Sequence, residues 1–168
     1  MTAEHTFENF SCGNPTLDGW LRIGALHAQS MRTARTFVWH RGDKVVVAFF
    51  SLAAHLVRRG DVPGRVGRGS PDAIPAILLA RLALDVPRHG KGLGAELLWD
   101  ALSRCVAAAD AAGARVVVVD AIDDAAAAFY AHFGFRAPTG EPLRLFQKIS
   151  DIAAALTEPP EARLDKKK

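Results

Sequence analysis

One glycine-rich segment is a candidate ligand-binding loop: His89-Gly90-Lys91-Gly92-Leu93-Gly94. Glycine lets backbone N–H groups approach a ligand closely, and the first turn of a helix carries N–H groups without intrahelical partners. Because a predicted strand precedes the segment and a predicted helix follows it, these amides and the helix dipole would form a phosphate or pyrophosphate site, to which Lys91 adds charge. The Gly-Lys-Ser/Thr ending of a Walker loop is missing, and Asp120 is a poor match to the acidic residue of a dinucleotide fingerprint. A tight strand–helix turn that binds nothing is the alternative interpretation.

Basic residues are the second candidate feature. The net charge is only +3, but residues 22–68 hold nine Arg and Lys residues against two Asp residues. Such a concentrated positive field attracts polyanions such as nucleic acid or phosphorylated ligands. A solvated, arginine-rich surface without a partner would produce the same pattern.

Cysteine and histidine offer little further chemistry. Cys12 and Cys105 cannot form a disulfide framework, so we expect free thiols. The six histidines lack metal-site spacing, so we expect no metal site. His55 is a candidate site residue at the end of a predicted strand, although a structural histidine is the simpler interpretation. No histidine partner can be assigned to Cys12, which argues against an acyl-cysteine intermediate.

Length and composition predict one compact domain. The chain has 168 residues, of which 49% are hydrophobic and 23% charged, close to an average soluble composition. No apolar run approaches the roughly 18–20 residues of a membrane span, and the first residues lack a secretory signal. We therefore expect a cytoplasmic protein with its domain at residues 1–156. The tail, residues 157–168, has almost nothing to bury and is expected to be loose.

The first half is predicted to form a helix followed by strands. Thr16 is a plausible N-cap for the helix, whose apolar stripe comprises Leu17, Trp20, Leu21 and Leu26. Strands at Thr36–His40 and Lys44–Val57 would form a hairpin through Arg41-Gly42-Asp43. Residues 58–75 are rich in Gly and Pro and are predicted to be a mobile loop. A third strand is expected at Ile77–Val86, with core candidates Leu78, Leu82 and Leu84.

The second half alternates helices and strands. A long helix is expected from the glycine segment to Ala112, with Gly113 as its left-handed C-cap. A strand buried on both faces follows at Arg115–Val119, then a helix capped by Asp123 or Asp124 that ends at His132, and a last strand at Leu143–Ile149. Because strand–helix–strand units require crossovers, part of the sheet must be parallel, whereas the hairpin is antiparallel. The fold class is therefore a mixed α/β domain.

Several segments resemble one known family. The stretch Leu79–Asp85 together with His89–Leu98 resembles the acetyl-CoA-binding core of GNAT-family N-acetyltransferases, whose pattern is Arg/Gln-x-x-Gly-x-Gly/Ala. Here His89 occupies the first place, while Gly92 and Gly94 are in register. Ala128–Phe135 resembles the family's Tyr-x-x-x-Gly-Phe ending. Phe10–Leu21 and Arg35–Val38 are similar to the branch formed by GNAT toxins of bacterial type II toxin–antitoxin modules, so that the resemblance covers roughly residues 7–150.

The resemblance implies a single-domain GNAT fold and an acetyl-CoA-dependent enzyme. Such toxins acetylate the free α-amino group of an amino acid attached to tRNA and thereby block translation. The resemblance also implies a cognate antitoxin with a ribbon–helix–helix DNA-binding domain and a homodimeric toxin.

The resemblance and the charge distribution together assign the site residues. Tyr130, the single tyrosine, would be the general acid that protonates the leaving thiolate. The residues assigned to acetyl-CoA binding are Leu82, Ala83, Leu84, His89, Gly90, Lys91, Gly92, Leu93 and Gly94. The candidates for tRNA contact are Arg32, Arg35, Arg58, Arg59 and Arg81. No dedicated base is required, because an α-amino group with a pKa of roughly 7.7–8.0 is partly neutral at cellular pH.

Two other functions stay open at this point. The protein could be a GNAT enzyme for a small amine or a protein N-terminus, which would transfer acetyl groups without RNA. It could also be a non-catalytic module that binds an antitoxin and tunes repression at DNA.

Overall fold

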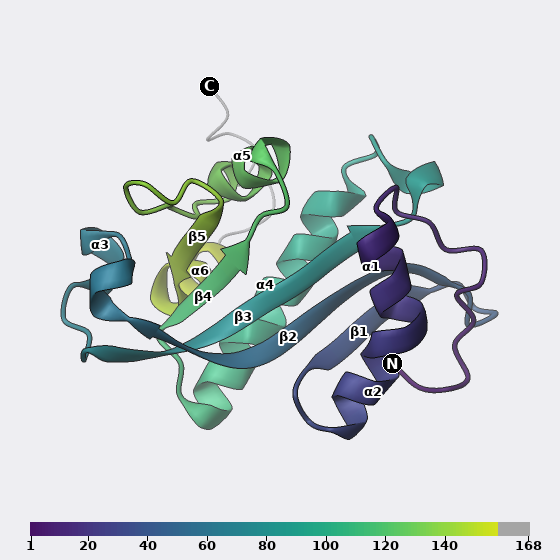
Figure 1. Cartoon of the computed structure of the whole chain (residues 1–168), viewed down its shortest axis with the longest axis horizontal. Helices are drawn as coiled ribbons and strands as arrows, with labels where there is room; N and C mark the ends of the chain where they lie inside the picture. Colours follow the sequence, from purple (N-terminus) through teal and green to yellow (C-terminus); the bar gives the residue numbers. More distant parts are fainter. Residues whose placement is uncertain (158–168) are drawn as a thin grey trace. The chain divides into compact units, whose positions relative to one another are not determined.

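The computed structural model describes residues 1–157, which form two compact units. The first unit comprises Met1–Ala54 and Leu79–Ala101, and the second takes up the rest of the described chain. A five-stranded sheet has the order β1-β2-β3-β4-β5 (Figure 1). The β1–β2 and β4–β5 pairs are antiparallel and the β3–β4 pair is parallel. The predicted mixed, partly parallel α/β sheet is therefore confirmed.

The N-terminal helical run of the first unit is less regular than predicted. It consists of α1 (Pro15–Gly19), a π-helical turn (Trp20–Gly24) and α2 (Ala25–Ser30). The N-cap is Asn14 rather than Thr16, because the Asn14 side chain accepts hydrogen bonds from the N–H groups of Thr16 and Leu17 at 3.0 and 3.2 Å. A Cβ at Gly24 would lie 2.5 Å from the Trp20 ring, so the π turn depends on glycine at that position.

The hairpin that follows is close to the prediction. Strands β1 (Arg35–His40) and β2 (Val46–Arg58) pair through a turn in which the Lys44 N–H donates to the Arg41 carbonyl at 2.9 Å. Lys44, not Gly42, takes the left-handed conformation, with φ at 63°. The core of this unit includes Phe10, Leu21, Val46, Phe49 and Ala83.

Strand β3 (Ala73–Leu84) leads through a 3₁₀ turn (Val86–Arg88) and the glycine loop into α4 (Leu93–Ala112). The strand begins at Ala73 rather than at Ile77, so the predicted loop over residues 58–75 is too long. Of the three predicted core residues Leu84 is buried, while Leu78 and Leu82 are only half-buried. Helix α4 ends as predicted, because Gly113 has φ at 80° and its N–H donates to the Ala109 carbonyl.

The second unit contains the elements that hold Tyr130. Strand β4 (Val116–Asp120) is followed by α5 (Asp124–His132), β5 (Arg144–Lys148) and α6 (Ile149–Thr157). Asp123 caps α5. Ile149 begins a helix instead of ending a strand, and the sequence analysis did not anticipate α6, whose Ile152 is fully buried.

The predicted loop over residues 58–75 also contains regular structure. A 3₁₀ turn at Arg59–Asp61 and a short helix, α3 (Gly64–Gly67), precede β3. Val62 and Val66 are buried in a cluster with Ile74 and Phe146, because the turns point them toward the sheet. The segment is thus anchored in the core of its unit.

The remaining predictions concern the tail, membranes and metals. Thr157 is the last residue of α6, and residues 158–168 of the predicted tail lie outside the described part of the chain. No helix within residues 1–157 has the length and apolarity needed to cross a membrane. Within the same residues no group of three or more His, Cys, Asp and Glu side chains could hold a metal ion.

Candidate active site

The glycine loop connects the end of β3 to the start of α4. Gly90 and Gly92 have φ values of 71° and 78°, a left-handed conformation that glycine adopts without strain. A Cβ at either position would have no heavy atom within 4 Å, so no neighbouring atom fills the space beside these two glycines. In the described part of the chain, the N–H groups of Lys91 and Gly92 have no acceptor. The loop therefore presents backbone donors and the positive end of α4 to a ligand.

The side chains of His89 and Lys91 brace this loop. The His89 Nε2 lies 2.7 Å from the Leu84 carbonyl oxygen, which can only accept, so Nε2 carries the proton. The Lys91 Nζ donates to the Pro87 carbonyl at 3.0 Å. Both residues were predicted to bind the ligand. In the structure, the His89 side chain is hydrogen-bonded to the end of β3 and the Lys91 side chain to the turn that precedes the loop.

The end of β3 is fixed by contacts within the first unit. Ala83 and Leu84 are buried. The Asp85 N–H donates to the Val47 carbonyl at 2.9 Å, and the Asp85 carboxylate accepts from the Ser11 N–H at 3.1 Å. The strand end that carries Leu82, Ala83 and Leu84 is thus packed, and the chain leaves it toward the predicted binding residues His89–Gly94 at a defined point.

Tyr130 lies on α5 in the second unit. Its side chain is 9% exposed, and its ring makes edge contacts with Phe129 and Phe135 at centroid distances of 5.4 and 5.7 Å. Burial raises the pKa of Tyr130 to about 12. The phenol is therefore protonated throughout the physiological range, as a proton donor must be.

Sequence reasoning missed a polar cluster in the second unit. The Arg144 guanidinium lies 3.3 Å from the Asp120 carboxylate and donates to His55 Nε2 at 3.0 Å. Because Nε2 accepts this hydrogen bond, the His55 ring is neutral, with its proton on Nδ1. His55 and Arg144 line an open pocket of about 400 Å³. The three residues come from different strands, and no local spacing in the sequence links them.

The five arginines predicted to contact tRNA differ in their surroundings. Arg32, Arg35 and Arg58 are exposed, without a side-chain partner in residues 1–157. Arg59 pairs with Asp72 and donates to the Ser70 carbonyl. The Arg81 guanidinium carbon lies 3.5 Å from the centroid of the Trp20 ring, a cation–π contact. Burial lowers the pKa of Arg81, which still leaves the guanidinium charged.

The two cysteines are unsuited to nucleophilic catalysis. Both thiols are free. Burial, with a further contribution from Asp18, raises the pKa of Cys12 to about 11, and burial raises that of Cys105 to about 12. Because the thiolate is the nucleophile, neither residue favours an acyl-enzyme intermediate at neutral pH. Direct transfer of an acyl group to an amine is the simpler chemistry.

Comparison with known proteins identifies the family. The model of the acetyltransferase (GNAT) family matches residues 4–135. The chain is 46% identical over 148 residues to the tRNA-acetylating toxin of Mycobacterium tuberculosis (strain ATCC 25618 / H37Rv), an alignment that covers 88% of this chain and 89% of the relative. It is 28% identical over 162 residues to the probable toxin TacT of Sinorhizobium fredii (strain NBRC 101917 / NGR234), covering 90% of each.

Solved structures show the same fold. AtaT complexed with acetyl-methionyl-tRNAfMet superposes with a TM-score of 0.83 at 24% identity, covering 93% of this chain and 95% of that one. AtaTR bound with acetyl-CoA gives a TM-score of 0.79 at 25% identity, covering 92% of each chain. The chain belongs to the GNAT family of acetyltransferases.

Proposed function

We propose that this protein is a toxin that transfers an acetyl group from acetyl-CoA to the α-amino group of aminoacyl-tRNA and thereby blocks translation. The observation that carries the proposal is the 46% identity, over 88% of the chain, to a tRNA-acetylating toxin. The proposal places the protein in the cytoplasm, where charged tRNA is used. It also includes a homodimer and a cognate antitoxin with a ribbon–helix–helix DNA-binding domain.

The glycine loop would hold the pyrophosphate of acetyl-CoA. Its left-handed glycines leave open space in front of backbone N–H groups that lack acceptors among the described residues. Hydrogen bonds from such amides to an anion need no side chain, which accounts for the tolerance of His89 at the first place of the family pattern. Backbone groups of Leu82, Ala83 and Leu84 would bind the pantetheine arm.

The acyl transfer itself needs one proton donor. The neutral α-amine attacks the thioester carbonyl carbon, a C–N bond forms, the C–S bond breaks, and the amine loses a proton to water. Tyr130 would supply a proton to the departing sulfur and recover one from solvent. Because Tyr130, with a pKa of about 12, is a weaker acid than a thiol, whose pKa is about 8.5, transfer to a free thiolate is uphill. We therefore expect the phenol first to stabilise the sulfur by a hydrogen bond as the C–S bond breaks, and the proton transfer to be completed only as the phenol regains a proton from solvent.

The basic residues would hold the tRNA. Arg32, Arg35 and Arg58 are exposed and unpaired within residues 1–157, so they are better placed for phosphate contacts than Arg59 and Arg81, which already have partners. Phosphate neutralisation releases counterions, so the affinity for tRNA must fall as the salt concentration rises. An affinity that does not depend on ionic strength would contradict this part of the proposal.

The test uses acetyl-CoA labelled in the acetyl group with total charged tRNA. We expect label in the RNA fraction, in an alkali-labile form that is absent when the tRNA has been deacylated beforehand. Label in protein or in small amines, with none in RNA, would reject the proposal in favour of another GNAT substrate. Growth inhibition that persists unchanged in a Tyr130→Phe variant would indicate that catalysis is not the toxic activity.

A further inference from the structure

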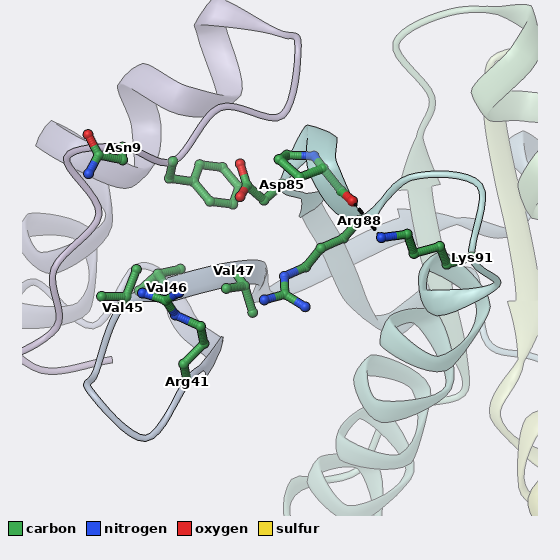
Figure 2. Close-up of a pocket in the computed structure, with 10 residues that line it drawn as sticks. Asn9, Arg41, Val45, Val46, Val47, Asp85, Arg88 and Lys91 are labelled. Atoms are coloured by element: carbon green, nitrogen blue, oxygen red, sulfur yellow. Dashed lines mark hydrogen bonds between the residues drawn. The ribbon is translucent and has the colours of Figure 1, made fainter.

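A pocket of about 460 Å³ lies in the first unit, next to the glycine loop. Figure 2 shows that Arg88, from the 3₁₀ turn, and Lys91, from the glycine loop, lie on one side of it, whereas Arg41 reaches it from the β1–β2 turn on the other side. Its walls are completed by Asn9, Phe10, Val45, Val46, Val47, Asp85 and Pro87. The sequence analysis assigned no role to Arg41 or Arg88.

The charges of this pocket favour an anion. Three cations face one carboxylate, and that carboxylate, Asp85, already accepts the Ser11 N–H at 3.1 Å. The Arg88 guanidinium has no hydrogen-bond or ion-pair partner in residues 1–157. The Arg41 guanidinium is paired with Asp43 at 2.8 Å, but both of those side chains are more than half exposed, so the pair is weak and easily exchanged.

The position of the pocket limits which anion fits. Arg88 directly precedes the glycine loop, and Lys91 lies within it. Because consecutive Cα atoms are about 3.8 Å apart, two of the three cations lie close to the backbone N–H groups that would bind a pyrophosphate. Coenzyme A carries a 3′-phosphate that is separated from its pyrophosphate by a single ribose. A phosphate monoester carries up to two negative charges and is recognised by several converging cations, among which arginine is preferred.

We propose that this pocket binds the 3′-phosphate of coenzyme A through Arg88, with Arg41 and Lys91 adding positive charge. The inference rests on the proposed function, because it presumes that the pyrophosphate of the same molecule lies on the glycine loop. It goes further by assigning a second phosphate site, in which Arg41 and Arg88 lie outside the coenzyme-binding residues predicted from the sequence. The protein therefore distinguishes coenzyme A from a coenzyme that lacks this phosphate.

The experiment compares CoA with dephospho-CoA, which differs only by the 3′-phosphate, in calorimetric titrations of the full chain. The wild-type protein is expected to bind CoA about tenfold more tightly, the size of one charge-assisted hydrogen bond. Arg88→Gln should weaken CoA binding about tenfold and leave dephospho-CoA binding unchanged. Arg41→Gln should have a smaller effect of the same kind. Arg68→Gln removes an exposed charge outside the pocket and is the matched control, expected to change neither affinity.

The outcomes separate this inference from the proposed function. Equal affinity of the wild-type protein for CoA and dephospho-CoA would overturn the inference while leaving acetyl transfer intact. A rise in the KM for charged tRNA in Arg88→Gln, with both coenzyme affinities unchanged, would also overturn it and assign the pocket to RNA. Binding of neither coenzyme would refute the proposed function itself. If Arg88→Gln does not fold, the inference is still tested by the affinities of the wild-type protein and of Arg41→Gln for CoA and dephospho-CoA.

Discussion

Replacing Tyr130 with phenylalanine tests both the proposed chemistry and the environment of the side chain. The substitution removes one hydroxyl and keeps the ring that packs against Phe129 and Phe135. Loss of a general acid typically lowers the rate by about 10²–10⁴-fold. We expect a kcat reduced by that factor with unchanged affinity for CoA, because the hydroxyl would act only as the C–S bond breaks.

The same substitution changes the stability at alkaline pH. The phenol has a pKa of 10.0 when unperturbed, and burial raises it to about 12 in the folded protein. Since the folded state holds the proton more tightly, this stabilisation is fully present below pH 10 and is lost as the pH rises through 12. At pH 11 the loss is about 1.4 kcal/mol, because pH 11 lies one unit above the unfolded pKa and one pKa unit corresponds to about 1.4 kcal/mol. Tyr130→Phe should therefore lose about 1.4 kcal/mol less than the wild-type protein between pH 8 and pH 11.

Direct titration of Tyr130 is the sharpest assay, because the chain contains one tyrosine. The ultraviolet absorbance of phenolate after a rapid pH jump reports this group alone. We expect a midpoint near pH 12 in the folded protein and near pH 10 in denaturant. A folded-state midpoint near 10 would show an exposed hydroxyl and refute the reasoning. A kcat within threefold of wild type in Tyr130→Phe would remove the general-acid role.

Three further predictions concern other parts of the chain. Gly92→Ala places a side chain at φ 78° and should destabilise the fold by about 1 kcal/mol. It should also lower the affinity for CoA, and an unaltered affinity in calorimetry would argue against the loop as the pyrophosphate site. Asp18→Asn should lower the free energy of unfolding by about 1–3 kcal/mol at neutral pH. Burial raises the pKa of Asp18, but hydrogen bonds from Cys12 and Ser11 and the charge of Arg22 lower it overall. The stabilisation is therefore present above the unfolded pKa and lost as the pH falls through the folded pKa. The difference between the two proteins in denaturant titrations should accordingly be smaller at pH 3 than at pH 7. Cys105, with a pKa of about 12, should resist iodoacetamide at pH 8 until the protein unfolds; rapid labelling of the native protein would contradict its burial.

Local signals in the sequence predicted the conformation of those parts of the candidate site that are made by one continuous segment. The glycine loop is such a part, because the left-handed conformations of Gly90 and Gly92 and the helix start after them are encoded by adjacent residues. The same holds for the end of α4 at Gly113 and for the cap of α5 at Asp123. The role of Tyr130 was assigned from a local motif. In the structure its ring is buried against Phe129 and Phe135, which lie close to it in the sequence.

Contacts between segments distant in the sequence determined most of the remaining features of the site and the fold. The Asp120–Arg144–His55 cluster joins residues from three strands, and the pocket of Arg41 and Arg88 joins a hairpin turn to the glycine loop. The cap of α1 is a local exception: Asn14 takes it in place of Thr16, because the Asn14 side chain accepts hydrogen bonds from the N–H groups two and three residues ahead. The turns over residues 58–75 were missed because their few apolar residues, such as Val62 and Val66, show no period until a core is present to bury them. Helix α6 was not predicted although Ile149, Ile152 and Leu156 have helical spacing, because the last predicted strand was extended to Ile149. Side-chain contacts between distant segments depend on how the strands pair, and the spacing of residues along the chain does not encode that pairing.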